Sequence, residues 1–178
     1  DPTTQRPRIV YRDNDRNALK FTYFDGSKWV IIDVDTTGNV GNDVGITLDS
    51  KGMAHIVYQA FLGNTNKLMH AVQSGNNFFR YEVESGPGTG YFPTIAMLDG
   101  DFPVISYNDQ TKHELRYTFY VGEKWNFYTL DSTVESVGWY ISMAINGAKL
   151  LFTYWSSVGL RYMTLDHKSA TSSVPTGS

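Results

Sequence analysis

The sequence predicts an all-β fold built from four repeats, and three observations support that prediction. A tripeptide ending in Tyr begins at residues 9, 56, 105 and 152, so its copies stand 47, 49 and 47 residues apart. A period in that range is typical of stacked repeats of secondary structure. Aromatic residues make up 15% of the chain, with 12 Tyr and 10 Phe, and such residues favour pleated strands. No long segment carries the apolar spacing of an amphipathic helix.

Each repeat contains more than the tripeptide. The four tripeptides are Ile9-Val10-Tyr11, Ile56-Val57-Tyr58, Ile105-Ser106-Tyr107 and Phe152-Thr153-Tyr154. A second match, beginning with Leu, follows each of them at residues 19–23, 68–72, 115–119 and 160–163. A third match, beginning with Trp or Phe, occurs in three repeats at residues 29–35, 78–84 and 125–131. The repeats therefore hold several strand-like segments in a fixed order.

We expect four short strands in a full repeat, named A to D in chain order, because each run is β-branched or aromatic and is bounded by Gly, Asn, Asp or Ser. The first repeat supplies B, C and D at 8–11, 19–23 and 29–35. The second supplies all four at 44–48, 54–59, 67–73 and 78–83. The third supplies all four at 94–98, 104–108, 114–120 and 125–130. The fourth supplies A, B and C at 141–145, 150–154 and 160–164.

The connections between these strands indicate a meander. The A-to-B and C-to-D connections are short and carry Gly, Asn and Asp, which tolerate the positive φ of tight hairpins. The D-to-A links are longer and Gly-rich, at residues 36–43, 85–93 and 132–140. A four-stranded meander repeated with a longer link is the sequence pattern of a β-propeller blade.

Residues 7–166 resemble the degenerate β-propeller repeats of secreted bacterial and archaeal surface proteins, most clearly at 49–58 and 99–107 followed by the strand that begins at Trp125. The resemblance implies a propeller fold and leaves the activity open, because propellers carry many unrelated functions. The sialidase-type Asp-box, Ser-x-Asp-x-Gly-x-Thr-Trp, is only echoed by residues 25–29. Its Asp-to-Gly spacing differs there, so sialidase activity is not implied.

The predicted domain organisation contains two complete and two partial blades. An N-terminal extension covers 1–6, the blades cover 7–43, 44–92, 93–140 and 141–168, and a flexible Ser/Thr-rich tail covers 169–178. The first blade lacks strand A and the fourth lacks strand D, which leaves strand edges that recruit another strand or aggregate. Three explanations stay open: residues 1–5 or 169–178 close a four-bladed ring, a second copy completes a larger ring, or the chain is one piece of a longer polypeptide. We favour completion by another chain or by missing sequence.

The composition excludes several kinds of partner. The net charge of −3 argues against nucleic acid, which needs clustered Lys and Arg. The chain has no cysteine, so disulfides and thiolate metal sites are excluded. No apolar run approaches the roughly 18 residues that a membrane-spanning helix needs. We expect no cofactor and no metal, and an extracellular or cell-surface location.

The candidate ligand-binding residues are aromatic side chains at one end of the blades. In a propeller the D-to-A and B-to-C connections share a face, and longer loops favour binding there. We expect the following residues on that face, in or beside its loops: Phe61, Tyr91, Phe92, Trp139, Tyr140 and Trp155. Exposed aromatic rings suit stacking on sugars or anchoring a partner protein. The alternative is that these rings fill gaps between blades.

Other conspicuous residues favour structural roles. Three rings at the start of strand D are expected to pack between blades: Trp29, Phe78 and Trp125. Asp13 and Asp109 both follow the strand-B Tyr, so we expect turn capping there; the EF-hand pattern fails because Ala18 replaces its Gly. Three strand-D carboxylates are expected to accept backbone N–H bonds: Asp35, Glu84 and Asp131. Of the histidines, His55 and His70 are expected on strands and His113 and His167 in loop or tail.

No catalytic set of residues occurs at a useful spacing, so no catalytic residue is assigned. The sequence therefore favours a non-catalytic extracellular binding module that recognises carbohydrate or another surface polymer. The alternative is a structural assembly subunit, an oligomer or fibre completed by strands from a neighbouring chain. A glycan-acting hydrolase or lyase is a third and weaker hypothesis, because it requires a converging carboxylate pair.

Overall fold

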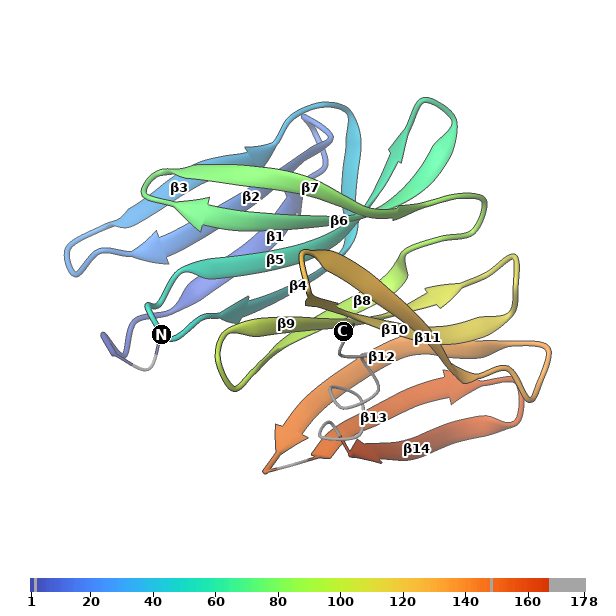
Figure 1. Ribbon diagram of the computed structural model, residues 1–178. Helices are drawn as coiled ribbons and strands as arrows, with labels where there is room; N and C mark the ends of the chain where they lie inside the picture. Colours follow the sequence, from blue (N-terminus) through green and yellow to red (C-terminus); the bar gives the residue numbers. More distant parts are fainter. Residues whose placement is uncertain (2, 148, 167–178) are drawn as a thin grey trace.

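Fourteen β-strands and no helix make up the part of the chain that the structure describes. In the computed structural model that part is residue 1 together with residues 3–147 and 149–166 (Figure 1). Within it, no helix has the length and apolar character needed to cross a membrane. The strands form four antiparallel sheets, and in each sheet neighbouring strands follow one another along the chain. The all-β prediction is therefore confirmed.

The sheets contain three, four, four and three strands in chain order. The first sheet holds β1 (Arg8–Asp13), β2 (Ala18–Phe24) and β3 (Trp29–Asp35). The second holds β4 (Asn39–Leu48), β5 (Ala54–Leu62), β6 (Thr65–Ser74) and β7 (Asn77–Ser85). The third holds β8 (Tyr91–Leu98), β9 (Phe102–Asp109), β10 (Glu114–Val121) and β11 (Lys124–Asp131). The fourth holds β12 (Val137–Asn146), β13 (Lys149–Ser156) and β14 (Gly159–Asp166).

The sheets pack on one another in the order of the chain. Strand β4 of the second sheet contacts β1 of the first and β8 of the third, and β8 in turn contacts β12 of the fourth. Figure 1 shows the first sheet, in blue, and the fourth, in orange and red, at opposite ends of this row. The strands A of the second, third and fourth sheets therefore follow one another along the stack, and strand B of the first sheet takes the place next to β4.

Strand A is longer than predicted, because it begins inside the D-to-A link. Strands β4, β8 and β12 start at Asn39, Tyr91 and Val137, several residues before the predicted starts. Near its start each of the three strands shows a register shift against its neighbour. A bulge of this kind bends a strand and increases its twist. The Gly-rich composition that suggested a loop is thus the composition of a bulged strand.

One glycine in or directly before each of these bulges allows two sheets to approach closely. Gly41, Gly90 and Gly138 have φ values of +75°, +83° and +78°, and each lies against a buried leucine of the preceding sheet, namely Leu19, Leu68 and Leu115. At Gly90, an added Cβ would lie only 3.1 Å from the Leu68 Cα. Glycine is therefore required both by the backbone conformation and by the packing.

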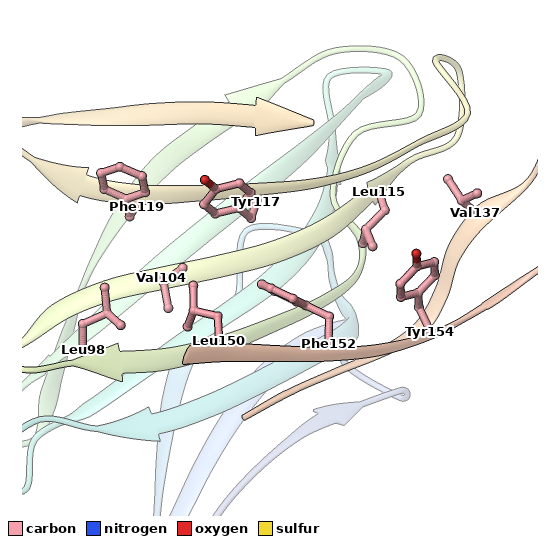
Figure 2. Packing of buried hydrophobic residues seen from close by; sticks show 9 residues of the cluster. All are labelled: Leu98, Val104, Leu115, Tyr117, Phe119, Val137, Leu150, Phe152 and Tyr154. Carbon is pink, nitrogen blue, oxygen red and sulfur yellow. The ribbon is translucent and has the colours of Figure 1, made fainter. Parts of the chain in front are cut away.

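Three hydrophobic clusters fill the spaces between successive sheets. The cluster between the third and fourth sheets is drawn in Figure 2, where Tyr117 of β10 lies near Phe152 of β13. The ring centroids of this pair are 6.4 Å apart. Similar clusters join the first to the second sheet and the second to the third. Because both faces of the two middle sheets are covered, consecutive residues are buried along their strands B, at residues 54–60 of β5 and 103–109 of β9.

A hydrogen bond from the tripeptide tyrosine crosses each contact between sheets. Tyr58 Oη donates to Asp35 Oδ2 over 2.7 Å, and Tyr154 Oη donates to Asp131 Oδ2 over 2.8 Å. Tyr107 donates to Glu84 in the same way. An arginine also pairs with each carboxylate, in the pairs Arg80–Asp35, Arg116–Glu84 and Arg161–Asp131. We call this tyrosine–carboxylate–arginine arrangement the carboxylate latch.

The predicted capping roles hold for most of the carboxylates. Asp13 accepts a hydrogen bond from the Arg16 N–H, and Asp109 accepts two from the turn that follows it. The backbone N–H of Thr37 donates to Asp35, and that of Thr133 donates to Asp131. These bonds confirm the expectation that strand D ends in a capped turn. The expectation is wrong for Glu84, which accepts no backbone N–H bond among the described residues; its carboxylate binds Tyr107 and Arg116 of the carboxylate latch instead.

The ring at the start of strand D packs between sheets in the second and third sheets but not in the first. Phe78 packs edge-on against Phe21 of the preceding sheet at 5.4 Å, and Trp125 packs against the cluster between the second and third sheets. Trp29 occupies the same position but is 48% exposed and contacts Phe24 of its own sheet. The packing prediction is therefore wrong for Trp29, because no described sheet precedes the first.

The N-terminal residues do not supply the missing strand A. Residue 1 and residues 3–5 form turn and coil, so the alternative in which residues 1–5 close the ring is wrong for the residues described. Asp1 is nevertheless held in place, since its carboxylate forms an ion pair with Arg8 at 2.6 Å. His167 and the predicted tail at 169–178 lie outside the described residues.

Candidate functional site

A cleft of about 530 Å³ opens between the second and third sheets, near their A-to-B and C-to-D hairpins. We call it the hairpin-end cleft. Its lining consists of His55, His70, Val72, Tyr81, Glu82, Asp101, Pro103, Tyr120 and Trp125. A concave space of this size, largely apolar and with a few polar groups, is typical of a small-molecule site.

A continuous line of rings runs through this lining. His55 stacks on His70 with ring centroids 5.1 Å apart, and Trp125 meets His70 edge-on at 5.6 Å. Tyr120 completes the line, edge-on to Trp125 at 5.3 Å. Tyr81 of β7 is the cross-strand partner of His70 and is exposed at the cleft. The rings come from both sheets, so the cleft exists only because the two repeats are stacked.

The two histidines are uncharged at neutral pH. A hydrogen bond of 3.0 Å joins His55 Nδ1 and His70 Nε2. Burial, together with the neighbouring His55, lowers the pKa of His70 to about 3. Burial also lowers the pKa of His55, although the carboxylates of Asp49 and Asp101 oppose that shift. The pair therefore presents neutral imidazoles, which can both donate and accept hydrogen bonds.

The two carboxylates of the cleft are held in their charged form. A hydrogen bond from Lys67, 2.6 Å from Glu82 Oε2, lowers the pKa of Glu82. Hydrogen bonds from the Ser50 hydroxyl and backbone N–H lower the pKa of Asp101. None of the residues that line the cleft is Lys or Arg. The arrangement therefore suits a polar, uncharged molecule with one apolar face.

The side chains that commonly hold metal ions do not form a candidate metal site in the described part of the chain. Among residues 1, 3–147 and 149–166, no group of three or more His, Asp or Glu side chains is arranged to hold a metal ion. The groups that line the cleft can stack on a ligand through their aromatic rings and can form hydrogen bonds.

All six sequence-predicted site residues lie on strands, which corrects the prediction that most of them belong to loops. Phe61 belongs to β5, Tyr91 and Phe92 to β8, Trp139 and Tyr140 to β12, and Trp155 to β13. For the residues of β8 and β12 the reason is the early start of strand A, and for Phe61 it is the extension of strand β5 to Leu62. Phe92 and Tyr140 both take positive φ, at 50° and 51°, as residues of the bulges.

The structure brings these six residues together in groups at the opposite end of the sheets, here called the aromatic end. The rings of Phe92 and Tyr140 lie 4.9 Å apart, and Trp139 is the cross-strand partner of Trp155. Phe61, Tyr91 and Phe92 line a hollow of about 540 Å³. The other residues of that hollow are polar: Asn39, Asn42, Asp43, Gln59, Asn66 and Gln110.

A smaller hollow of about 210 Å³ adjoins the first one. Trp139 and the exposed His113 line it, and Gln110 lines both hollows. The two hollows occupy equivalent places, one between the second and third sheets and one between the third and fourth. In the larger hollow, the buried Gln59 Nε2 has no hydrogen-bond partner among the described residues. The aromatic end is therefore a second place where a polar ligand would fit.

Sequence reasoning missed the hairpin-end cleft. It assigned His55 and His70 to strands, and both are indeed buried there, but it assigned them to packing alone. It also treated Trp125 as a packing residue, whereas that ring both packs and lines the cleft. One available signal was the departure from the repeat, because His70 stands where the other complete repeat has Tyr117.

The row of four antiparallel sheets places this chain among all-β proteins whose fold is similar to that of β-propeller lectins. No protein-family model matches the chain. No curated protein sequence matches it either. The similarity is found among solved structures.

Two of these structures contain a mutant of the Aleuria aurantia lectin. In the complex with Fucalpha1-6GlcNAc, the TM-score is 0.64 and the identity 18%, over 88% of this chain and 52% of the lectin chain. In the complex with alpha-methyl-L-fucoside, the TM-score is 0.59 and the identity 14%, over 91% of this chain and 58% of the lectin chain. The chain thus spans little more than half of the lectin, and identities this low show a shared fold alone.

Proposed function

We propose that the protein is a non-catalytic carbohydrate-binding module and that the hairpin-end cleft is its principal site. The observation that carries this proposal is the line of four aromatic rings from His55 to Tyr120, two of which are neutral imidazoles. Two ionised carboxylates lie beside this line. A sugar ring has an apolar face that stacks on aromatic rings and hydroxyl groups that pair with such acceptors and donors. The similarity in fold to fucoside-binding lectins supports the same function.

The charges of the cleft favour neutral sugars. Glu82 and Asp101 are ionised; Lys67 pairs with Glu82 from outside the lining, and no Lys or Arg lines the cleft to pair with an acidic ligand. A carboxylated sugar would meet like charge, which costs binding free energy in a partly desolvated site. Fucose-containing glycans are the natural first candidates, since the lectin neighbours were solved with Fucalpha1-6GlcNAc and alpha-methyl-L-fucoside.

The test is binding of the purified chain to an array of neutral and acidic glycans, followed by calorimetric titration of the best neutral saccharide. Trp125→Ala removes one ring of the cleft, so we expect it to reduce affinity at least tenfold. A tenfold loss corresponds to about 1.4 kcal/mol of binding free energy. Trp29→Ala is the matched control, because Trp29 holds the same repeat position on a sheet that has no such cleft. It should leave affinity unchanged.

A second variant distinguishes a loss of binding from a loss of the folded state. Tyr81→Ser removes an exposed ring from the same cleft, so it should weaken binding without loss of the urea-unfolding midpoint. Saturable binding of a neutral glycan that survives both Trp125→Ala and Tyr81→Ser would overturn the assignment of this cleft. Absence of binding to every array glycan would overturn the function itself.

The aromatic end is the second candidate site for the same function. Its larger hollow combines two kinds of group that bind sugars, the rings of Phe61 and Tyr91 and a set of amide side chains. Here the sensitive variants are Tyr91→Ser and Trp139→Ala. If these reduce glycan binding and Trp125→Ala does not, the aromatic end is the site.

An extracellular or cell-surface location stays a prediction.

A further inference from the structure

The outward face of the fourth sheet exposes side chains that the other three repeats bury. Leu160 of β14 is 73% exposed, whereas the three leucines at its repeat position are fully buried: Leu19, Leu68 and Leu115. Tyr162 is 62% exposed, whereas its counterparts are buried against the following sheet: Phe21, His70 and Tyr117. Trp155, the cross-strand partner of Leu160, is exposed on the same face. This face therefore has the composition of an interface between sheets.

The outward face of the first sheet shows the complementary exposure. Ile9 of β1 is 46% exposed, whereas its three counterparts are fully buried against the preceding sheet: Ile56, Ile105 and Phe152. Ile9 lies opposite Thr22, which lies opposite Ile31, so the three share this face. Ile31 and Trp29 are exposed. The first sheet thus presents the half of an inter-sheet contact that the fourth sheet lacks.

We propose that the chain associates head to tail with a second copy of itself, the outward face of the first sheet in one copy packing on the outward face of the fourth sheet in the other. The chain itself supplies the model for this joint. In three internal contacts, residues at the Ile9 position pack over residues at the Leu160 position of the preceding sheet. A second copy presents the strand-B, strand-C and strand-D part of this contact in the right order, so the joint repeats that part of an interface that the chain forms three times.

The joint is weaker than the internal contacts because two components are missing. The first sheet has no strand A, the segment whose glycine lies against the leucine of the preceding sheet in each internal contact. Tyr11 is the tripeptide tyrosine of the first sheet, and it is half-buried with no side-chain hydrogen bond among the described residues. The carboxylate that completes the latch in the internal contacts lies on strand D or at its end, as Asp35, Glu84 and Asp131 do. The described part of the fourth sheet has no strand D. Association is therefore expected to depend on protein concentration.

The experiment measures molar mass by light scattering and sedimentation velocity over a concentration series. The wild-type chain is expected to move from the mass of one chain to multiples of it. Leu160→Asp and Ile9→Asp each place a charge in one of the two faces, and each variant alone should keep the mass of one chain. Phe79→Asp is the matched control, because Phe79 is an equally exposed ring on β7 of the second sheet. It should associate like the wild type.

Mixing the two variants tests the head-to-tail arrangement itself. The Leu160→Asp chain keeps an intact first-sheet face and the Ile9→Asp chain keeps an intact fourth-sheet face, so the mixture should form a 1:1 complex. The double variant should form none. A symmetric joint, with the same face on both sides, cannot be rescued in this way. Unchanged urea-unfolding midpoints show that the variants fold; Tyr162→Asp and Trp29→Asp replace any variant that does not.

Three results would overturn the proposal. One is a wild-type chain that keeps the mass of one chain at every concentration. Another is association that persists in both single variants, or that is lost equally in Phe79→Asp. The third is a variant mixture that forms no complex although the wild type associates. None of these outcomes bears on glycan binding, which is measured through the hairpin-end cleft variants, so the two proposals stand or fall separately.

Discussion

Tyr58 Oη donates a hydrogen bond of 2.7 Å to Asp35 Oδ2, and this bond joins the second sheet to the end of the first. The same relationship joins Tyr154 to Asp131 between the last two sheets. Both tyrosines are almost fully buried, and burial together with the carboxylate raises their pKa values. The recurring Tyr of the sequence is therefore explained by a contact with the preceding repeat.

Removing that hydroxyl should destabilise the protein. Tyr58→Phe leaves Asp35 buried with one hydrogen bond fewer, and hydrogen bonds to charged groups contribute about 1.5–3 kcal/mol. We expect the free energy of unfolding to fall by about that amount in urea titrations. Tyr11→Phe is the control, since Tyr11 has no such carboxylate, and its effect should stay within about 0.5 kcal/mol. Equal losses in the two variants would contradict the role given to the latch.

Acid should weaken the last contact between sheets. Burial raises the pKa of Asp131, but hydrogen bonds from Thr133, Tyr154 and Arg161 outweigh it and lower the pKa to about 2. A carboxyl with a lowered folded-state pKa stabilises the fold above its unfolded pKa of about 3.9, and this stabilisation is lost as pH falls towards the folded value. Urea midpoints should therefore drop between pH 4 and pH 2. Asp131→Asn should flatten that drop, and an unchanged slope would contradict the assignment.

The close approach of two sheets should make one glycine hard to replace. In Gly90→Ala the new Cβ would sit 3.1 Å from the Leu68 backbone at a φ of +83°. Gly122 also has positive φ, at +61°, but nothing lies within 4 Å of its Cβ position. Gly122→Ala should cost only the backbone strain, about 1–2 kcal/mol. Gly90→Ala should cost about 1–3 kcal/mol more, because the sheets must separate. Similar losses in both variants would count against the packing argument.

The buried His70 should make the stability of the fold depend on pH over a higher pH range than Asp131 does. Burial lowers the pKa of His70 to about 3, while an unfolded His titrates near about 6.5. Between these values the unfolded chain binds more protons, so stability falls as pH drops from about 6.5 towards 3. His70→Phe places at this position the ring that the first repeat has there, Phe21. Its urea midpoints at pH 7, 5.5 and 4 should fall less steeply than those of the wild type.

The sequence was sufficient to predict the strands, their order and the number in each sheet. This succeeded because the repeat aligns four copies of the same segment, so the pattern around Tyr58 supports the one around Tyr107. The start of strand A was predicted less well. Residues such as Gly41 and Gly138 look like loop residues, and only the structure shows that they belong to bulged strands that lie against the preceding sheet.

The candidate site was predicted only in part. The aromatic end was found because Tyr91, Phe92 and Trp139 stand out as rings beside glycines. The hairpin-end cleft was missed because its lining comes from two repeats whose facing residues are far apart in the chain, as His70 and Trp125 are. Each of those residues looks like a packing residue within its own strand. Their common role depends on the way the second sheet stacks on the third.

The measurement that tests the glycan-binding proposal most directly is the indole N–H region of an NMR spectrum during a titration with a neutral glycan. The chain has four Trp, so four signals are expected, each assigned by its own substitution. We predict that the Trp125 signal shifts on titration while those of Trp29, Trp139 and Trp155 stay in place. A shift confined to Trp139 and Trp155, or no shift with any glycan, would contradict the hairpin-end cleft as the binding site.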